Sequence, residues 1–498
     1  MQNSAAAALP NSSAVATSLP HVVPASPEPP PAEAEPAPPA PSAPRLHAIR
    51  GIPPILQLPN KQTGRYIGYI RVGESVALRQ AAVVPGADCA GGYFAIEPRG
   101  YVCNDSFVSL APSSEHTVAM AATAPREGPF PYRYAISNGA PMYNRIPTRS
   151  EITRYEHVFG PAGKFEKLSP FLASHEDLAV NEPIPPTDPI PPFLEGGQMI
   201  RPGRFGLVRQ KIPRGSMLSY TKAFEADGRT YLLSVDLTVV PADRVRPFRP
   251  SSFRGIWLEG DETLPIAWFR KRPRMKWRKL STGAVESMGI SFPARSHARL
   301  TGQSIDVEGT KYLETKEREG ADVVWVAEED ATVVEARTKL PFGVREGQKW
   351  IIVRITQGTL VAYEGSKPVY ATLISPGAGG VPVAGIDPVK ASTTPLGTYN
   401  ITFKDRAATM SPEMGENRSF WIADVPHTQY FNAPFALHAA YWHERFGEPT
   451  SAGCVNLSPI DAEIVFRWSD PPVPLGWQGA VGAGASVNGP TTAVVVAR

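Results

Sequence analysis

Proline and glycine interrupt this chain so often that a helical bundle is disfavoured. There are 54 prolines and 42 glycines among 498 residues, and both residue types break helices and favour turns. Between these breaks lie short runs rich in apolar and β-branched residues, such as 66–70 and 230–235. Runs of this kind, bounded by turn residues, are typical of strands. The sequence therefore predicts a mainly β protein built from several small domains.

Composition bounds what the chain can do. Hydrophobic residues make up 42% of it, so most of the chain can bury a core. The formal net charge of +3 is too small to indicate nucleic acid as a partner; it either suits loose contact with an anionic surface or means nothing. Because no apolar run reaches the roughly 18 residues that span a bilayer, we expect no transmembrane segment. We also expect a monomer.

Pattern and composition divide the chain into six stretches. The first, 1–45, is rich in Ala, Pro and Ser and predicts a disordered tether that lacks the basic and apolar regions of a signal peptide. The last, 479–498, is expected to be a flexible tail. The stretches between them are the predicted folded domains: 46–112, a small barrel; 113–261, a β-rich region without an assigned role; 262–345, a second barrel-like region; and 346–478, which carries the candidate chemistry.

The three cysteines divide into a local pair and a single residue. Cys89 and Cys103 lie in one predicted domain, whereas Cys454 stands alone near the C-terminus. The pair forms either a disulfide, which indicates an oxidising compartment, or two ordinary buried thiols. A disulfide here closes a loop of about 15 residues and contributes up to ~3 kcal/mol.

The chain from residue 350 onward has the clearest pattern. Strands are predicted at 351–356, 359–364 and 369–375. A helix is predicted to begin after Ser458, which can accept a hydrogen bond from the first turn, and to end near residue 468.

One cysteine and one histidine in this region can form a nucleophile and its base. Cys454 follows Gly453, and His438 lies 16 positions earlier. A thiol is a weak nucleophile at pH 7 unless a neighbour such as histidine activates it. Gly453 allows a sharp turn, so that backbone N–H groups near Cys454 can form an oxyanion hole. The alternative is that Cys454 is a small buried hydrophobic residue.

The segment also carries a family resemblance. His438 followed by Ser451-Ala452-Gly453-Cys454-Val455-Asn456 resembles the signature of L,D-transpeptidases of the YkuD family. Residues 393–403 and 360–377 resemble the family's Thr-Pro-x-Gly strand entry and its opening hairpin. The resemblance covers about 345–478 and implies a β-sandwich or barrel with a short helix after the cysteine. Farther upstream, 46–112 resembles bacterial SH3-like domains.

The resemblance implies a role for each matching residue. Cys454 is the expected nucleophile, His438 the general base, and the carbonyl of Ala439 the group that orients the imidazole. Gly453 and Cys454 supply the expected oxyanion-hole backbone. Ser451 matches the hydroxyl position of the motif.

Further positions match pocket residues or depart from the motif. Trp442 and Asn456 fall at expected substrate-binding positions, with packing and turn structure as the respective alternatives. Ala452 stands where the family usually has a second histidine, which puts rate, substrate preference or activity in question. His443 either replaces that histidine in part or is simply packed or exposed.

The implied function is peptidoglycan cross-linking in the cell envelope. Cys454 would form a thioester with a tetrapeptide stem and pass it to an amine, without a metal or cofactor. Two alternatives stay open at this point. One is a catalytically weak or inactive peptidoglycan-binding protein. The other is an L,D-carboxypeptidase in which water replaces the amine.

Overall fold

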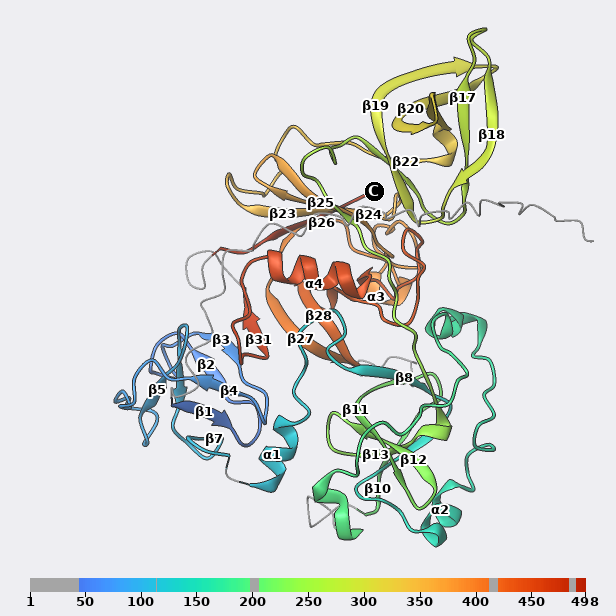
Figure 1. The fold of residues 1–498 in the computed structure, drawn as a ribbon. Coiled ribbons are helices and arrows are strands. Elements are labelled where there is room, and N and C mark those ends of the chain that lie inside the picture. Colours follow the sequence, from blue (N-terminus) through green and yellow to red (C-terminus); the bar gives the residue numbers. More distant parts are fainter. Residues whose placement is uncertain (1–43, 113, 198–205, 412–419, 483–489) are drawn as a thin grey trace, which may run out of the picture. The chain divides into compact units, whose positions relative to one another are not determined.

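The computed structural model describes residues 44–112, 114–197, 206–411, 420–482 and 490–498 (Figure 1). Strands dominate the described residues, which confirms the predicted mainly β fold. The predicted tether at 1–45 lies outside the described residues except for its last two positions. Arg45 already begins the first strand.

The N-terminal region consists of short strands and one helix. Strands β4, β1 and β7 form a three-stranded sheet, and the other strands join a larger sheet. The elements are β1 (Arg45–Ala48), β2 (Pro54–Leu56), β3 (Tyr66–Tyr69), β4 (Ser75–Ala77), β5 (Tyr93–Ala95), β6 (Tyr101–Cys103), β7 (Val108–Ser109) and α1 (Glu115–Ala121). The SH3-like character of 46–112 stays a prediction.

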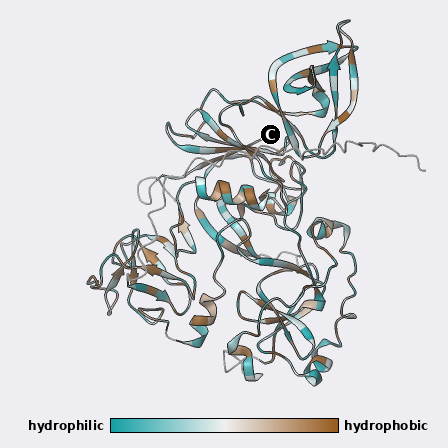
Figure 2. Cartoon of the chain, in the orientation of Figure 1, coloured by the Kyte–Doolittle hydropathy of each residue, from teal (hydrophilic) through white to brown (hydrophobic). Residues whose placement is uncertain are grey.

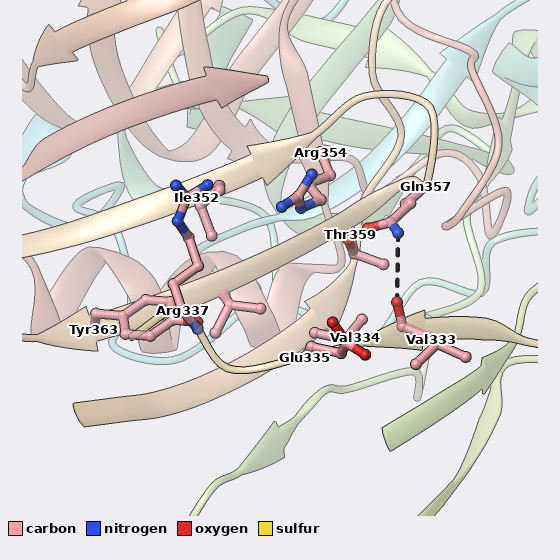
Figure 3. Close-up of a pocket in the computed structure, with 10 residues that line it drawn as sticks. Val333, Val334, Glu335, Arg337, Ile352, Arg354, Gln357, Thr359 and Tyr363 are labelled. Carbon is pink, nitrogen blue, oxygen red and sulfur yellow. Dashed lines mark hydrogen bonds between the residues drawn. The ribbon is translucent and has the colours of Figure 1, made fainter. Parts of the chain in front are cut away.

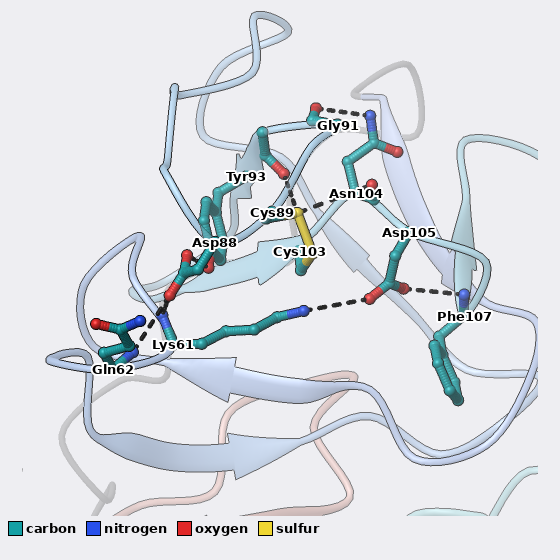
Figure 4. The surroundings of a disulfide bond; sticks show 11 residues. Lys61, Gln62, Asp88, Cys89, Gly91, Tyr93, Cys103, Asn104, Asp105 and Phe107 are labelled. Carbon is teal, nitrogen blue, oxygen red and sulfur yellow. Dashed lines mark hydrogen bonds and ion pairs between the residues drawn. A yellow bond between two sulfur atoms is a disulfide. The ribbon is translucent and has the colours of Figure 1, made fainter.

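Cys89 and Cys103 form a disulfide in this region (Figure 4). It links the loop before β5 to the end of β6, and both residues are buried together with Leu56 and Tyr93. The hydroxyl of Tyr93 donates to Asp88, which lies next to Cys89 in the sequence. The bridge and this hydrogen bond therefore fix a region with a small apolar core.

The middle region was predicted to be β-rich over 113–261, and its part from 122 to 255 contains seven strands, one α-helix and three short 3-10 helices among the described residues. They are β8 (Arg133–Ser137), β9 (Ala140–Tyr143), α2 (Arg149–Glu156), η1 (Pro170–Glu176), η2 (Pro192–Gly197), β10 (Val208–Ile212), β11 (Met217–Ala226), β12 (Arg229–Ser234), β13 (Val239–Pro241), η3 (Ala242–Arg244) and β14 (Val245–Pro247). At its centre the buried carboxylate of Glu156 pairs with Arg229 and Arg244.

The region after it is a seven-stranded antiparallel sheet in the order β18-β17-β21-β20-β19-β16-β22. Hydrophobic and hydrophilic residues alternate along its strands (Figure 2), and Phe269, Phe292, Leu313 and Val324 form its core. The elements are β16 (Ile266–Phe269), β17 (Arg274–Lys279), β18 (Val285–Phe292), β19 (Ser296–Val307), β20 (Thr310–Glu319), β21 (Asp322–Ala327), η4 (Glu328–Asp330) and β22 (Thr332–Val334).

The C-terminal region combines a six-stranded sheet, in the order β15-β25-β24-β23-β32-β26, with strands of the largest sheet and with helix α4. The predicted strands correspond to β23, β24 and β25. The elements are β15 (Ile256–Trp257), β23 (Lys349–Arg354), β24 (Thr359–Glu364), β25 (Lys367–Leu373), α3 (Pro388–Ala391), β26 (Gly397–Asn400), β27 (Phe403–Met410), β28 (Ile422–Asn432), β29 (Phe435–Ala439), β30 (Val455–Leu457), α4 (Pro459–Trp468), β31 (Gly479–Val481) and β32 (Ala493–Ala497).

The end of the chain differs from the expected flexible tail at 479–498. Strand β32 pairs in parallel with β23 and antiparallel with β26. Val494 and Val496 face one core and Val495 faces another, so the strand is buried on both sides. An uninterrupted apolar run is typical of such a central strand, and this run is the signal that the sequence interpretation missed.

The largest sheet passes from the N-terminal region into strands of the C-terminal region. Strand β3 pairs with β31, and β31 pairs with β27; Figure 1 shows β31 between them. The apolar core beneath is also shared, because Phe466 of α4 and Trp477 pack among residues of β1 to β7. The N-terminal region is thus joined to the C-terminal region by backbone hydrogen bonds as well as by side chains.

Candidate active site

The register of two parallel strands places the candidate nucleophile and base. Leu437 of β29 pairs with Val455 of β30, and both belong to the core beside α4. Because side chains alternate along a strand, His438 points to the opposite face. Cys454 comes directly before β30, in the bend that follows Gly453. The register therefore brings the residue before β30 next to the strand that carries His438.

His438 is held in one orientation by the backbone. Its Nδ1 lies 3.0 Å from the carbonyl oxygen of Ala439, so Nδ1–H donates and Nε2 is left as a proton acceptor. The ring is buried, and burial lowers its pKa to about 4 although the hydrogen bond to Ala439 opposes that shift. At neutral pH the imidazole is therefore uncharged and can accept a proton.

Cys454 lies directly before β30, beside the turn between β28 and β29, and is half-buried. It is not part of the disulfide. Its Sγ is 3.9 Å from the carbonyl oxygen of Pro434. The preceding residue, Gly453, has a φ of 123°, and a Cβ there would lie 2.6 Å from the ring of Phe435. A residue with a side chain cannot be accommodated at 453 without a shift of the ring.

Ser451 fixes the loop that carries the thiol. Its hydroxyl donates to the carbonyl oxygen of Cys454 at 2.5 Å and accepts from the N–H of Gly453 at 3.1 Å. Ala452 between them is exposed. The hydroxyl position of the motif thus holds the backbone turn, and the position that usually carries histidine contributes no polar side chain.

Trp442 covers the imidazole of His438. The two ring centroids are 6.1 Å apart, and Trp442 is almost fully buried. The Trp442 ring also contacts the ring of His175 in η1, with the two centroids 6.3 Å apart, and the carbonyl oxygen of Trp442 accepts a hydrogen bond from the N–H of Leu178. Packing against the base is the role that these contacts give it.

Asn456 and His443 form a buried pair next to the site. The Asn456 side-chain nitrogen lies 3.0 Å from Nε2 of His443, and the Asn456 backbone exchanges hydrogen bonds with Ser375. Burial lowers the pKa of His443 to about 3. His443 is therefore a packed, uncharged residue, which answers the sequence question about it.

Two contacts at the site were not anticipated from the sequence. Tyr430 of β28 is paired with Ala436, the residue of β29 that aligns with Cys454 when the parallel register is continued by one position. Burial, Asp405 and Cys454 raise the pKa of Tyr430 to about 12. In addition, Asp177 of the middle region forms a bidentate ion pair with Arg445. Alternation along 422–432 could have identified Tyr430, whereas nothing local indicates Asp177.

A cavity of about 160 Å³ lies elsewhere in the C-terminal region (Figure 3). It is bounded by Val333 and Val334 at the end of β22, by Glu335 and Arg337 after it, and by residues of β23 and β24. The side-chain nitrogen of Gln357 donates to the carbonyl oxygen of Val333, and the Tyr363 hydroxyl accepts from the N–H of Arg337. Neither Cys454 nor His438 lines it.

The described residues contain neither a cluster of metal-ligating side chains nor a helix that could span a membrane. Within the described ranges, no group of three or more His, Cys, Asp or Glu residues lies close enough to hold a metal ion. None of the helices in those same ranges is long and apolar enough to cross a membrane.

Comparison with known families identifies the catalytic region. Residues 348–495 match the L,D-transpeptidase catalytic domain, the YkuD family. This part of the chain is therefore an L,D-transpeptidase catalytic domain. It extends past the boundary expected at 478 and includes β31 and β32. A search of curated proteins finds no match.

Several solved L,D-transpeptidase structures are similar to part of the chain. The enzyme from Xylanimonas cellulosilytica is 20% identical over 32% of this chain and 64% of its own, with a TM-score of 0.21. The catalytic domain from E. faecium is 18% identical over 31% and 99%, with a TM-score of 0.22. The Mycobacterium smegmatis protein is 15% identical over 40% and 98%, with a TM-score of 0.22. The chain thus spans less than two thirds of the first of these structures.

Proposed function

We propose that this protein is a cysteine-dependent L,D-transpeptidase that cross-links peptidoglycan in the cell envelope. The observation that carries the proposal is the parallel pairing of β29 with β30, which sets Cys454, directly before β30, beside the strand of His438, together with the Ala439 carbonyl that leaves Nε2 of the imidazole as an acceptor. This is the arrangement that a thiol nucleophile and its general base require.

The first step is acylation of the enzyme. Nε2 of His438 accepts the thiol proton as the sulfur of Cys454 attacks the carbonyl carbon between the L-centre of the third stem residue and the terminal D-residue. The N–H of Gly453 already donates to Ser451, so we assign stabilisation of the oxyanion to the backbone N–H of Cys454. The C–N bond breaks, His438 returns the proton to the departing amine, and a thioester remains on Cys454.

The second step transfers the stem peptide. An amine of a neighbouring stem attacks the thioester carbonyl, and His438 accepts the amine's proton. The C–S bond breaks, and the proton passes to the sulfur, so that the thiol is restored with a new amide formed. Water in place of the amine would give a carboxypeptidase. Because Ala452 has no polar side chain, other groups must select the acceptor.

His438 acts here as a general base and not as one half of a permanent ion pair. Burial lowers its pKa to about 4, so the resting imidazole is neutral at pH 7. The buried Trp442 ring beside it keeps water from the base. Proton transfer therefore accompanies attack, when the substrate is bound.

Product analysis tests the proposal. The full chain is incubated with disaccharide-tetrapeptide, and the products are separated by chromatography and mass spectrometry. We expect released terminal D-residue and a cross-linked dimer, both absent with Cys454→Ala. Tripeptide without dimer would replace the transpeptidase by the carboxypeptidase, and no product with any donor would leave a wall-binding protein.

A further inference from the structure

Three aromatic side chains form a row on the sheet that joins the N-terminal and catalytic regions, and a fourth, Tyr66, lies on the same strand as Tyr69, beyond a register shift. We call Tyr66, Tyr69, Phe403 and Tyr430 the aromatic strip. The ring centroids of Tyr430 and Phe403 are 6.3 Å apart, and those of Phe403 and Tyr69 are 6.2 Å apart with planes only 13° from parallel. Tyr66 is 42% exposed and the other three are half-buried. None of the four belongs to a hydrophobic core cluster of the described chain.

Strand pairing explains why these rings share a face. Phe403 of β27 is paired directly with Tyr430 of β28. Tyr69 of β3 is opposite Gly479 of β31, and Gly479 is in turn opposite Asp405. Because directly paired residues point to the same face and alternate residues do so along one strand, Tyr69, Asp405, Phe403 and Tyr430 lie on one side.

A glycine and a buried carboxylate hold Tyr69 in place. A Cβ at Gly479 would lie 2.7 Å from the Tyr69 ring, so the glycine lets the ring cross over β31. The Tyr69 hydroxyl then donates to Asp405 at 2.7 Å. Asp405 also accepts from the side chain of Gln478 and the N–H of Ala407. The ring is thus fixed before any ligand binds, which reduces the entropy that binding must overcome.

The strip ends at the candidate nucleophile. Tyr430 is paired with Ala436 of β29, and continuation of the β29–β30 register by one residue aligns Ala436 with Cys454. The sequence of paired positions therefore runs from the thiol through Tyr430 and Phe403 to β3 of the N-terminal region.

We infer that the aromatic strip binds the glycan chain of peptidoglycan while the attached stem peptide reaches Cys454. A sugar ring has an apolar C–H face and hydroxyl groups at its edge, so it stacks on exposed aromatic faces and bonds to tyrosine hydroxyls. In peptidoglycan the stem peptide is covalently linked to such a sugar. The inference rests on the proposed function and adds a sugar-binding role for the N-terminal region.

Equilibrium binding tests the inference separately from catalysis. Every protein carries Cys454→Ser, so that no turnover occurs, and the probes are peptide-free glycan strands and sugar-free tetrapeptide. We expect Tyr66→Ala and Phe403→Ala each to weaken glycan binding by about 3-fold to 10-fold, the range that one aromatic contact contributes. Tetrapeptide binding should change less than glycan binding in both variants.

A matched control and a fold control accompany these variants. Phe107→Ala removes another aromatic ring of the N-terminal region that is 41% exposed but outside the strip, and it should leave the glycan Kd unchanged. Thermal unfolding shows whether each variant is folded. If Phe403→Ala does not fold, Tyr66→Ala, the substitution at the most exposed position, tests the inference by itself.

The possible outcomes separate the two proposals. If the glycan binds Tyr66→Ala as tightly as the parent, or if Phe107→Ala weakens binding equally, the strip is not a glycan site. If the variants lose tetrapeptide binding instead, the strip is a peptide surface and the inference is wrong. If glycan binding depends on the strip but no donor ever acylates Cys454, the proposed function fails while the glycan site stands.

Discussion

The N-terminal region and the seven-stranded region are both small β units, but they are attached to the catalytic region in different ways. The first shares a sheet with it through β3 and β31 and shares a core that contains Trp477. The second keeps its own sheet and has a core of its own around Phe269, while Ile266, Trp268 and Val334 on the other face of β16 and β22 pack into a core of the catalytic region. Its contacts with the catalytic region are made by side chains, such as Arg270, which donates to the carbonyl oxygens of Gln357 and Gly447.

The difference concerns how far a local change is transmitted. Backbone pairing together with a common core makes two regions unfold together, whereas packing of side chains without backbone pairing couples two regions less strongly. The N-terminal region should therefore affect the stability of the catalytic site more than the seven-stranded region does. The predictions below test this contrast.

The largest expected effect is that of Trp477→Ala, with Phe269→Ala as its matched partner. Both side chains are completely buried, and truncation of such a residue costs about 3–5 kcal/mol. We expect Trp477→Ala to lower the unfolding temperature of the N-terminal and catalytic regions together, and Phe269→Ala, whose ring lies in the separate core, to lower chiefly that of the seven-stranded region. Scanning calorimetry and the acylation rate of Cys454 after heating measure both effects. A catalytic region that melts normally in Trp477→Ala would contradict the shared core.

Reduction of the Cys89–Cys103 disulfide should have the next largest effect. The bond joins residues 14 positions apart, and closing a loop of this size stabilises the folded state by about 3 kcal/mol in the chain-entropy model. We expect reductant to lower the unfolding temperature of the coupled N-terminal and catalytic regions. The double variant Cys89→Ser/Cys103→Ser should unfold at the same lowered temperature and ignore reductant, and an unchanged temperature in both would refute the prediction.

Tyr69→Phe should give a smaller loss, of about 1–3 kcal/mol. The substitution keeps the ring but removes one of the donors to the buried carboxylate of Asp405, and an incompletely satisfied buried acceptor costs this amount. The control is Tyr101→Phe, in the same region but away from the β3–β31 junction. Urea unfolding of the full chain measures both, and equal stability of the two variants would argue against the junction as a source of coupling.

Local features of the sequence predicted the helix and several strands of the catalytic region. Helix α4 begins after Ser458, whose side chain accepts from the N–H of Asp461, and ends at Trp468, which confirms the prediction. The pairing of Cys89 with Cys103 was one of two alternatives and is the one that the structure contains. These features depend on residues close together in the chain.

Contacts between distant residues could not be predicted in the same way. Tyr69 and Asp405 are separated by 336 positions, and no local pattern indicates which edge strand will pair with which. The same holds for Asp177, which reaches Arg445 from the middle region. The role of His438 and Cys454 was predicted from their motif, whereas the pairing of Tyr430 with Ala436 becomes apparent only from the register of β28 and β29.

Intact-mass spectrometry of the full chain exposed to a carbapenem, followed from pH 3 to pH 8, tests whether buried His438 activates Cys454. We predict one covalent adduct on the parent protein and none on Cys454→Ala. Because the protonated imidazole cannot accept the thiol proton, the acylation rate should fall on acidification with a midpoint near the His438 pKa of about 4. An adduct that persists in Cys454→Ala, no adduct on the parent, or a midpoint near the ordinary histidine pKa of about 6.5 would contradict the proposed mechanism.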